Sequence, residues 1–220
     1  MKILALDSSG LVASVAVVEN DTLLAEYTVN YKKTHSQTLL PMLDEISNMT
    51  ELDLSTIDAI AVAGGPGSFT GLRIGSATAK GLGLALEKPL ISIPTTAAIA
   101  YNIWDTDKFV CPIMDARRNQ VYTGVYCYTD HRLDTVWEQD TMSIEALAEG
   151  LNCLDHEVIF LGDGVAVYRE KLEALLTIPF SFAPAHVNRQ RAAAVGALAE
   201  VYYKEGKIPV SYTHLRAHET

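Results

Sequence analysis

The sequence has none of the long apolar runs that mark membrane-embedded proteins. Its 220 residues contain no run close to the roughly 18 apolar residues that cross a bilayer. The longest candidate, Ile57–Ala63, has the length of a strand. The first four residues lead directly into a strand-like segment, whereas a signal peptide needs a longer apolar region and a small-residue cleavage site. We therefore expect a cytoplasmic protein with no membrane association.

Cysteine is also scarce. The three cysteines, Cys111, Cys127 and Cys153, are odd in number, far apart in the sequence and without C-x-x-C spacing. This pattern argues against a disulfide framework and against a cysteine zinc site. Cys111 falls in a strand-like run, where a cysteine serves as a small buried apolar residue.

A dense basic cluster is a third absence. The formal net charge is −10, and the nearest approaches to a cluster are Lys32-Lys33 and the pair Arg189 and Arg191. A protein that binds RNA without a partner normally carries a basic patch or stripe. If the chain works on RNA, a partner must supply most of the phosphate contacts, so we expect only indirect RNA binding.

Strand-like and helix-like segments alternate along the chain, which predicts an α/β fold. The first three strands, Ile3–Leu6, Val12–Val18 and Leu23–Val29, are separated by polar turns and predict an antiparallel meander. Helical spacing of apolar residues follows at 35–48 and again at 72–86. Each of these helices is followed by a short strand-like run.

The order of elements then repeats in the second half. A strand pair, a turn containing an aspartate, a strand, a glycine loop and a helix recur from about residue 108, and the last helix is predicted at 190–203. We therefore predict an N-terminal lobe at 1–104 and a C-terminal lobe at 105–209. The segment 210–220 has no helical or strand periodicity and resembles one reading frame of a common sequencing adapter, so we predict a non-native tail there.

Three turn segments have compositions that suit phosphate binding. Asp7-Ser8-Ser9-Gly10 follows the first strand, a loop with four glycines spans 64–71 before a helix, and Gly162-Asp163-Gly164 lies between a later strand and helix. Glycines before a helix expose N–H groups to an anion, although no lysine follows the second loop and plain turns are the alternative for all three. The candidate vestigial nucleotide loops comprise Asp7, Ser8, Ser9, Gly65, Gly67, Ser68, Gly162, Asp163 and Gly164.

Catalytic and metal motifs are missing. There is no G-x-S-x-G, and the histidines outside the tail, which are His35, His131, His156 and His186, form no H-x-x-x-H or H-E-x-x-H pair. The segment 115–118 joins two strands, and a charged hairpin turn explains it. We expect no catalytic residue, no bound metal and no cofactor.

Together these segments resemble the TsaB family. The likeness covers residues 2 to about 209, and its most specific part is the block Gly65-Pro66-Gly67-Ser68-Phe69-Thr70-Gly71-Leu72-Arg73. The supporting segments keep the family's order and spacing: Ile3-Leu4-Ala5-Leu6-Asp7-Ser8-Ser9, His35-Ser36-Gln37, Leu40-Pro41-Met42 and Met114-Asp115-Ala116-Arg117-Arg118.

The resemblance implies a two-lobed fold similar to actin, Hsp70 and the sugar kinases, with mixed sheets flanked by helices. TsaD, the related transferase, carries a metal-binding H-x-x-x-H after the strand that follows the glycine-rich helix. The corresponding stretch here, Pro94–Tyr101, contains no histidine. A site without ligands holds no metal, so the resemblance implies an accessory subunit that is not itself an enzyme.

The same resemblance implies partners. A TsaB-like chain heterodimerises with TsaD, recruits the ATPase TsaE, and supports N6-threonylcarbamoylation of adenosine 37 in tRNAs that read codons beginning with A. Self-association of the isolated chain is left open. Two rival functions remain: a small kinase of the same fold, and a metallopeptidase, which is an older label of this superfamily.

Two helices are candidates for the TsaD contact, because each carries an apolar row beyond what one stripe of core requires. The alternative is that both rows are buried within this chain. The predicted interface comprises His35, Leu39, Met42, Ile46, Ile74, Thr78 and Leu82.

Overall fold

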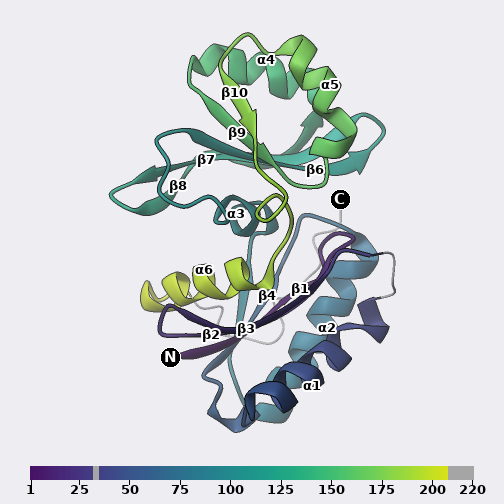
Figure 1. The fold of residues 1–220 in the computed structure, drawn as a ribbon, viewed down its shortest axis with the longest axis vertical. Helices are drawn as coiled ribbons and strands as arrows, with labels where there is room; N and C mark the ends of the chain where they lie inside the picture. The colour runs from purple at the N-terminus through teal and green to yellow at the C-terminus, as the bar shows by residue number, and fades with distance from the viewer. Residues whose placement is uncertain (32–34, 208–220) are drawn as a thin grey trace. The chain divides into compact units, whose positions relative to one another are not determined.

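The computed structural model describes residues 1–31 and 35–207 (Figure 1). The predicted tail, 210–220, and the residues 32–34 before the first helix lie outside the described residues. The described residues form two compact units: the first holds Met1–Ala98 and 190–207, and the second holds Ile99–Arg189. Each unit is built around one five-stranded sheet.

The sheet of the first unit has the order β3-β2-β1-β4-β5. Antiparallel pairing of β1 with β2 and of β2 with β3 confirms the predicted meander, while β4 and β5 continue the sheet in parallel with β1. The central strands are apolar on both faces, as expected for strands covered on both sides. The strands are β1 Lys2–Asp7, β2 Ala13–Glu19, β3 Thr22–Val29, β4 Ala59–Ala63 and β5 Leu90–Ile93.

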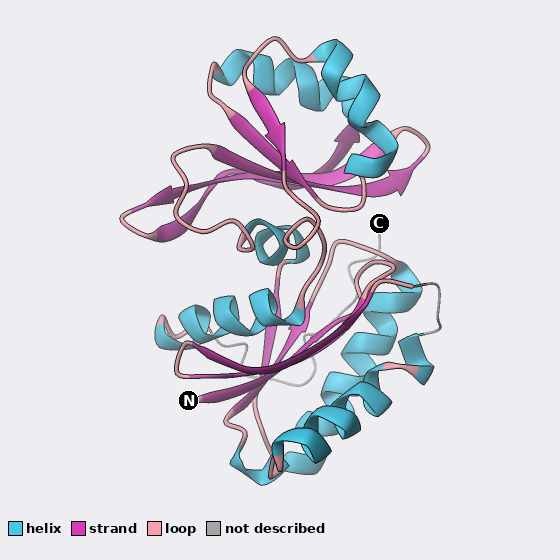
Figure 2. Ribbon diagram, viewed as in Figure 1, coloured by secondary structure: helices cyan, strands magenta, loops and turns pink. Residues whose placement is uncertain are grey.

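Helices lie on both faces of this sheet (Figure 2). On one face α1 and α2 bury a core of leucine, isoleucine and valine side chains from β1, β2 and β4, and on the other face α6 packs against β1 and β2. Short helices lead into α1 and β4, and α3 follows β5. The helices are η1 His35–Gln37, α1 Leu39–Thr50, η2 Leu54–Thr56, α2 Phe69–Leu86, α3 Thr95–Ala100 and α6 Ala192–Lys204.

Two helix starts differ from the sequence prediction. The first helix was expected from 35, but a 3-10 turn occupies 35–37 and α1 begins at Leu39, which places Pro41 in the first turn, where its missing N–H breaks no helical hydrogen bond. The second was expected from 72, but α2 begins at Phe69. The Ser68 hydroxyl accepts a hydrogen bond from the Gly71 N–H at 3.3 Å, so it caps the helix three residues earlier.

The second unit repeats the topology of the first. Its sheet has the order β10-β9-β6-β7-β8, with β6, β7 and β8 antiparallel and β9 and β10 parallel to β6. Helices α4 and α5 cover one face. The elements are β6 Phe109–Arg117, β7 Gln120–Thr129, β8 Arg132–Ser143, α4 Ile144–Leu154, β9 Val158–Leu161, α5 Val165–Leu175 and β10 Phe180–Phe182.

Strands β8 and β10 were not predicted from the sequence. Strand β8 lies at the edge of the sheet, and its pairing with β7 is interrupted by two register shifts, one between Thr123 and Val125 and one between Val125 and Tyr126. A shift moves the following side chains to the other face, so the strand shows no regular alternation. Strand β10 has only three residues, too few for a periodic signal.

The predicted division into 1–104 and 105–209 needs correction at its C-terminal part, because α6 packs in the first unit. The start of α6 is held there by polar contacts: Glu26 on β3 pairs with Arg191 and accepts from the Ala193 N–H at 3.1 Å, and the Ser14 hydroxyl accepts from the Ala192 N–H at 2.9 Å. A carboxylate at a helix N-terminus is favourable because the first N–H groups lack helical partners.

None of the helices among the described residues combines the length and the apolar character that crossing a lipid bilayer requires.

We predict that Gly196→Ala destabilises the protein, whereas Gly81→Ala stabilises it. A Cβ at Gly196 in α6 would lie 2.8 Å from Val18 Cγ2 and 3.2 Å from Ala5 Cβ, whereas a Cβ at Gly81 in α2 meets no atom within 4 Å. Overpacking should lower the free energy of unfolding by about 1 to 2 kcal/mol for Gly196→Ala. Better helix propensity should raise it by up to about 1 kcal/mol for Gly81→Ala. Urea unfolding measures both, and equal effects would contradict the packing of α6.

Candidate functional site

The turn between β1 and β2 is buried and uses its own polar groups. Asp7, Ser8 and Ser9 are at most 2% exposed. One carboxylate oxygen of Asp7 accepts hydrogen bonds from the Ser9 N–H at 2.9 Å and from the Ser9 hydroxyl at 2.6 Å. The Ser8 hydroxyl donates to the Gly71 carbonyl at 2.8 Å. The side chains proposed for phosphate binding therefore stabilise the turn and its contact with α2.

The glycine-rich loop packs directly on this turn. The Ser68 N–H donates to the Ser9 carbonyl at 2.7 Å. A Cβ at Gly67 would lie 2.2 Å from the same carbonyl oxygen, and the φ angle of Gly67 is +154°. Close approach of two backbones and a positive φ both require glycine here. This contact explains the glycine at 67 without any ligand.

Other N–H groups of the loop are also engaged within the protein. The Gly64 N–H donates to the Ile93 carbonyl at 2.8 Å, and the Gly65 N–H donates to the Thr95 hydroxyl at 3.1 Å. With Ser68 and Gly71, four N–H groups of the segment 64–71 thus have protein acceptors. A phosphate cradle needs N–H groups that point at the ligand, so these four are not available to form one.

The third candidate loop, Gly162-Asp163-Gly164, also packs closely against a backbone carbonyl, that of Ile113 within β6 of the second unit. The Gly164 N–H donates to the Ile113 carbonyl at 3.0 Å, and a Cβ at Gly162, with φ +100°, would lie 2.2 Å from that oxygen. The Gly162 N–H donates to the Asn188 carbonyl at 2.9 Å. Since β9 corresponds to β4 in the repeated topology, the two glycine loops occupy equivalent places.

Asp163 differs from its neighbours because its carboxylate is largely buried. Its Oδ1 atom is buried and forms no hydrogen bond within the described residues. Burial raises the pKa of the Asp163 carboxyl above its ordinary value, and the positive charge of Arg189 and a hydrogen bond from the Asp115 backbone oppose this shift. Ionisation of the Asp163 carboxyl in the folded protein therefore lowers the free energy of unfolding.

Cysteine and metal chemistry have little support in the described part of the chain. Burial raises the pKa of the Cys111 thiol to about 12, which keeps it protonated and unreactive. Among the residues that the structure describes, no three His, Cys, Asp or Glu side chains gather as a metal site would require. In the stretch 94–101, Thr95 instead holds the glycine-rich loop through Gly65.

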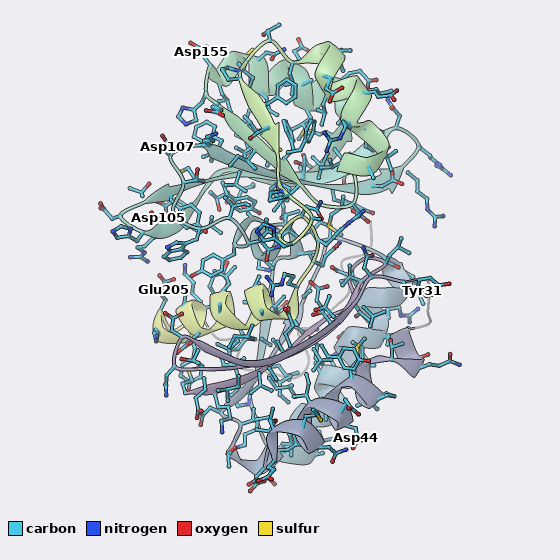
Figure 3. All side chains as sticks on the ribbon, in the orientation of Figure 1. Tyr31, Asp44, Asp105, Asp107, Asp155 and Glu205 are labelled. Atoms are coloured by element: carbon cyan, nitrogen blue, oxygen red, sulfur yellow. The ribbon has the colours of Figure 1, made fainter. Side chains whose placement is uncertain are left out.

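Three of the residues predicted to contact a partner lie on α1 and are buried within this chain. Leu39, Met42 and Ile46 are 1%, 4% and 5% exposed and belong to the core between the helices and the sheet, as does Leu43. These side chains are buried because α1 packs against the sheet and against α2, whereas Leu40 on the same helix is 54% exposed. Asp44 lies on the outward side of α1 (Figure 3). The side chain of His35 lies outside the described residues.

The predicted row on α2 is only half-buried. Ile74 and Leu82 pack against the same core, and Thr78 is intermediate in exposure. The exposed side of α2 carries a different row, which we call the α2 outer row. It is apolar at both ends, with Phe69 53% and Leu84 73% exposed. Its members are Phe69, Arg73, Ala77, Gly81 and Leu84.

Gly81 has no local reason to be glycine. A Cβ at Gly75 would meet the Ser8 hydroxyl and a Cβ at Gly83 would meet Leu90, but a Cβ at Gly81 meets nothing within 4 Å. Glycine in a helix interior costs stability. A small residue between exposed Phe69 and Leu84 leaves room for another helix to approach α2 closely.

Comparison with known proteins places the chain among tRNA-modification proteins. A family model described as "TsaD: tRNA N6-adenosine threonylcarbamoyltransferase" matches residues 22–213. A curated relative in Bacillus subtilis (strain 168), named tRNA threonylcarbamoyladenosine biosynthesis protein TsaB, is 35% identical over 176 residues, which cover 80% of this chain and 77% of the relative. Both descriptions name the threonylcarbamoyl modification of tRNA.

Solved structures confirm the predicted fold class. The structure titled "YeaZ from Pseudomonas aeruginosa" has a TM-score of 0.85 at 25% identity and covers 100% of this chain and 99% of that chain. An inorganic polyphosphate/ATP-glucomannokinase from Arthrobacter sp. strain KM has a TM-score of 0.52 at 17% identity, covering 92% and 99%. The similarity to the glucomannokinase concerns the fold alone, and it shows that the chain shares its fold class with a sugar kinase.

We predict that Gly67→Ala costs about 3 kcal/mol of unfolding free energy, because the new Cβ clashes with the backbone of Ser9 and the φ is unfavourable. Gly206→Ala is the control. It has a positive φ of +71° but no atom within 4 Å of the Cβ, so it should cost only about 1 kcal/mol. Denaturant unfolding of both variants measures the difference. Equal losses would mean that the loop does not pack against the turn.

We also predict that Asp163→Asn stabilises the protein near pH 7 and has no such effect below about pH 3. Burial raises the folded-state pKa of Asp163, so as pH rises above the unfolded-state value near 3.8, the unfolded chain ionises first and stability falls. The amide removes that loss and still accepts from the Asp115 N–H. Melting temperatures of both proteins from pH 3 to 7 test this, and a gain that is equal at all pH values would contradict it.

Proposed function

The chain belongs to the TsaB family of tRNA threonylcarbamoyladenosine biosynthesis proteins, and from this premise we propose that it acts as a non-catalytic subunit of a tRNA threonylcarbamoyltransferase complex. It pairs with TsaD and the pair recruits the ATPase TsaE. The assembly modifies adenosine 37 of tRNAs that read codons beginning with A, in the cytoplasm. The chain supports this reaction without contributing a reacting group.

The observation that carries the non-catalytic role is the internal use of the glycine-rich loop. Four N–H groups of 64–71 donate to protein acceptors, and the Asp7 carboxylate binds its own turn. A kinase of this fold needs both to face the phosphates of a nucleotide. We propose that the three candidate nucleotide loops are vestigial and are retained because they hold the strands and helices together.

The two rival functions have less support. A metallopeptidase needs metal ligands, and the stretch 94–101 contains Thr95 and Thr96 but no histidine. A stand-alone kinase needs N–H groups free to bind phosphate. Turnover of ATP by the isolated chain above roughly 1 per second, at the low end of typical enzymes, would favour the kinase.

The α2 outer row is our proposed TsaD contact, in place of the residues on α1 that the core occupies. It combines exposed apolar side chains, Phe69 and Leu84, with the small residues Ala77 and Gly81 between them. Such a surface lets a second helix pack closely and bury apolar area. Arg73, whose guanidinium lies 5.0 Å from the Phe69 ring centroid, supplies a polar group at the same surface. By the resemblance of TsaB to TsaD, the approaching helix is the equivalent helix of TsaD.

We predict that Leu84→Glu leaves the chain folded but abolishes TsaD binding and tRNA modification together. Leu84 is 73% exposed, so the free energy of unfolding of the variant should differ from that of the parent by at most about 0.5 kcal/mol. At a desolvated interface an unpaired charge should weaken binding by at least about 100-fold. The control is Met49→Glu on α1, which introduces the same charge at a 77% exposed position outside the row. Calorimetry with TsaD and nucleoside analysis of modified tRNA provide the measurements.

Each outcome of this experiment has one meaning. A folded Leu84→Glu variant that binds TsaD normally would disprove the proposed surface but leave the function intact. Loss of binding by the Met49→Glu control alone would move the surface to α1. If the parent chain neither binds TsaD nor supports modification, the proposed function itself is wrong.

A further inference from the structure

The hairpin turn between β6 and β7 has an unusual backbone. Arg118 and Asn119 form its two-residue tip with φ angles of +51° and +62°, and Arg117 before them has φ +66°. The strand register also shifts between Asp115 and Arg117, which marks a bulge. Three successive residues that are not glycine are therefore held in the left-handed region.

Two other hairpins of the same chain show how this turn is normally built. Asn20-Asp21 and Asp130-His131 also have positive φ at both tip positions. Asparagine, aspartate and histidine are the residues other than glycine that adopt this region most readily. Arginine has no such preference, so Arg117 and Arg118 have positive φ angles that their residue type does not favour. Strain of this kind at a defined position indicates a role beyond folding.

The side chains of Arg117 and Arg118 are exposed and form no ion pair in the described part of the chain. The carboxylate of Asp115 is near in sequence, but its Oδ1 atom accepts from the Arg117 backbone N–H at 2.9 Å and from the Tyr168 hydroxyl at 3.1 Å. Elsewhere basic side chains do find carboxylates, as in the pair Lys108–Glu157.

Asn119 anchors the tip to the helices of its unit. Its amide nitrogen donates to Glu145 on α4 at 2.8 Å, and its amide oxygen accepts from Lys171 on α5. Glu145 and Lys171 also pair with each other at 3.3 Å. Asn119, Glu145 and Lys171 thus bind one another and hold the tip in place. The guanidinium groups of Arg117 and Arg118 on the same tip are exposed to solvent.

We propose that Arg117 and Arg118 bind phosphate groups of the tRNA backbone. A guanidinium presents paired N–H donors that match two oxygens of one phosphate. The chain carries a net charge of −10, which repels RNA in general, so a contact must be made locally by cations that no carboxylate neutralises. An open hairpin tip is accessible to a polyanion, whereas a small phosphate ligand is normally enclosed. This inference rests on the proposed function, since it gives the chain one direct contact with the substrate of the complex.

The test compares Arg117→Asn and Arg118→Asn with the parent in the complex with TsaD. Each variant should weaken tRNA binding about tenfold in low salt, because a charge-assisted hydrogen bond is lost. Each should also reduce the slope of log affinity against log salt by about one. Because asparagine tolerates positive φ, neither variant should melt at a lower temperature than the parent. Arg118→Lys should keep the salt slope and part of the affinity.

The matched control is Arg169→Gln, which removes one exposed positive charge from α5 in the same unit. It should leave tRNA affinity unchanged, so general charge loss is separated from loss at the tip. Parallel measurements of ATP and TsaD binding distinguish the source of the anion. Reduced ATP binding with normal tRNA binding would overturn the proposal in favour of a nucleotide site. Reduced TsaD binding would overturn it in favour of an acidic protein partner.

Two further results are decisive. If the variants assemble with TsaD and bind tRNA as the parent does, the inference fails while the proposed function stands. If the parent chain forms no complex with TsaD, the proposed function and this inference fail together.

Discussion

Close contact between two loop backbones holds the first unit together. The Ser68 N–H reaches the Ser9 carbonyl, and Gly67 has no side chain to keep the two loops apart. This contact joins the end of β1 to the start of α2, and the Ser68 hydroxyl caps the helix at the same point. Thr95 extends the connection to α3 through Gly65. The position of α2, and hence of its outer row, depends on this packing.

The second unit also packs a glycine loop against a backbone carbonyl, but the contact of Gly162 and Gly164 is with Ile113 inside β6 and not with the turn after it. The two units differ at the hairpin turn beside it. In the first unit Ser8 and Ser9 are buried beneath the glycine-rich loop, whereas in the second the residues from Arg117 to Gln120 are exposed. One turn is used for packing, and the other is left accessible to a ligand.

These features suit a subunit that works through surfaces and not through a reaction centre. In the glycine-rich loop, the N–H groups of Gly64, Gly65, Ser68 and Gly71 donate to acceptors within the protein. Exposed Phe69 and Leu84, together with Gly81, form an apolar surface on one unit, and Arg117 and Arg118, which have no ion pair among the described residues, lie on the other. Because the chain carries a net charge of −10, the proposed RNA contact is confined to a few positions, and the proposed partner supplies the rest.

The sequence by itself determined the fold class and the meander, because the order of strand-like segments, helix-like segments and turns is a local pattern. It determined the family because the block Gly65–Arg73 is also a local pattern. It also predicted a hairpin turn at Asp115–Arg118, whereas in the structure β6 continues to Arg117 and the tip is formed by Arg118 and Asn119. Tertiary structure decided what local patterns do not contain. Leu39, Met42 and Ile46 show an apolar row, but only the positions of α2 and the sheet determine that this row is core. The helix near the C-terminus joins the first unit because Glu26 and Ser14, far away in sequence, bind its start. The glycine-rich loop has the composition of a phosphate cradle, yet its Gly64, Gly65 and Ser68 N–H groups donate to carbonyl and hydroxyl oxygens that only folding brings within reach.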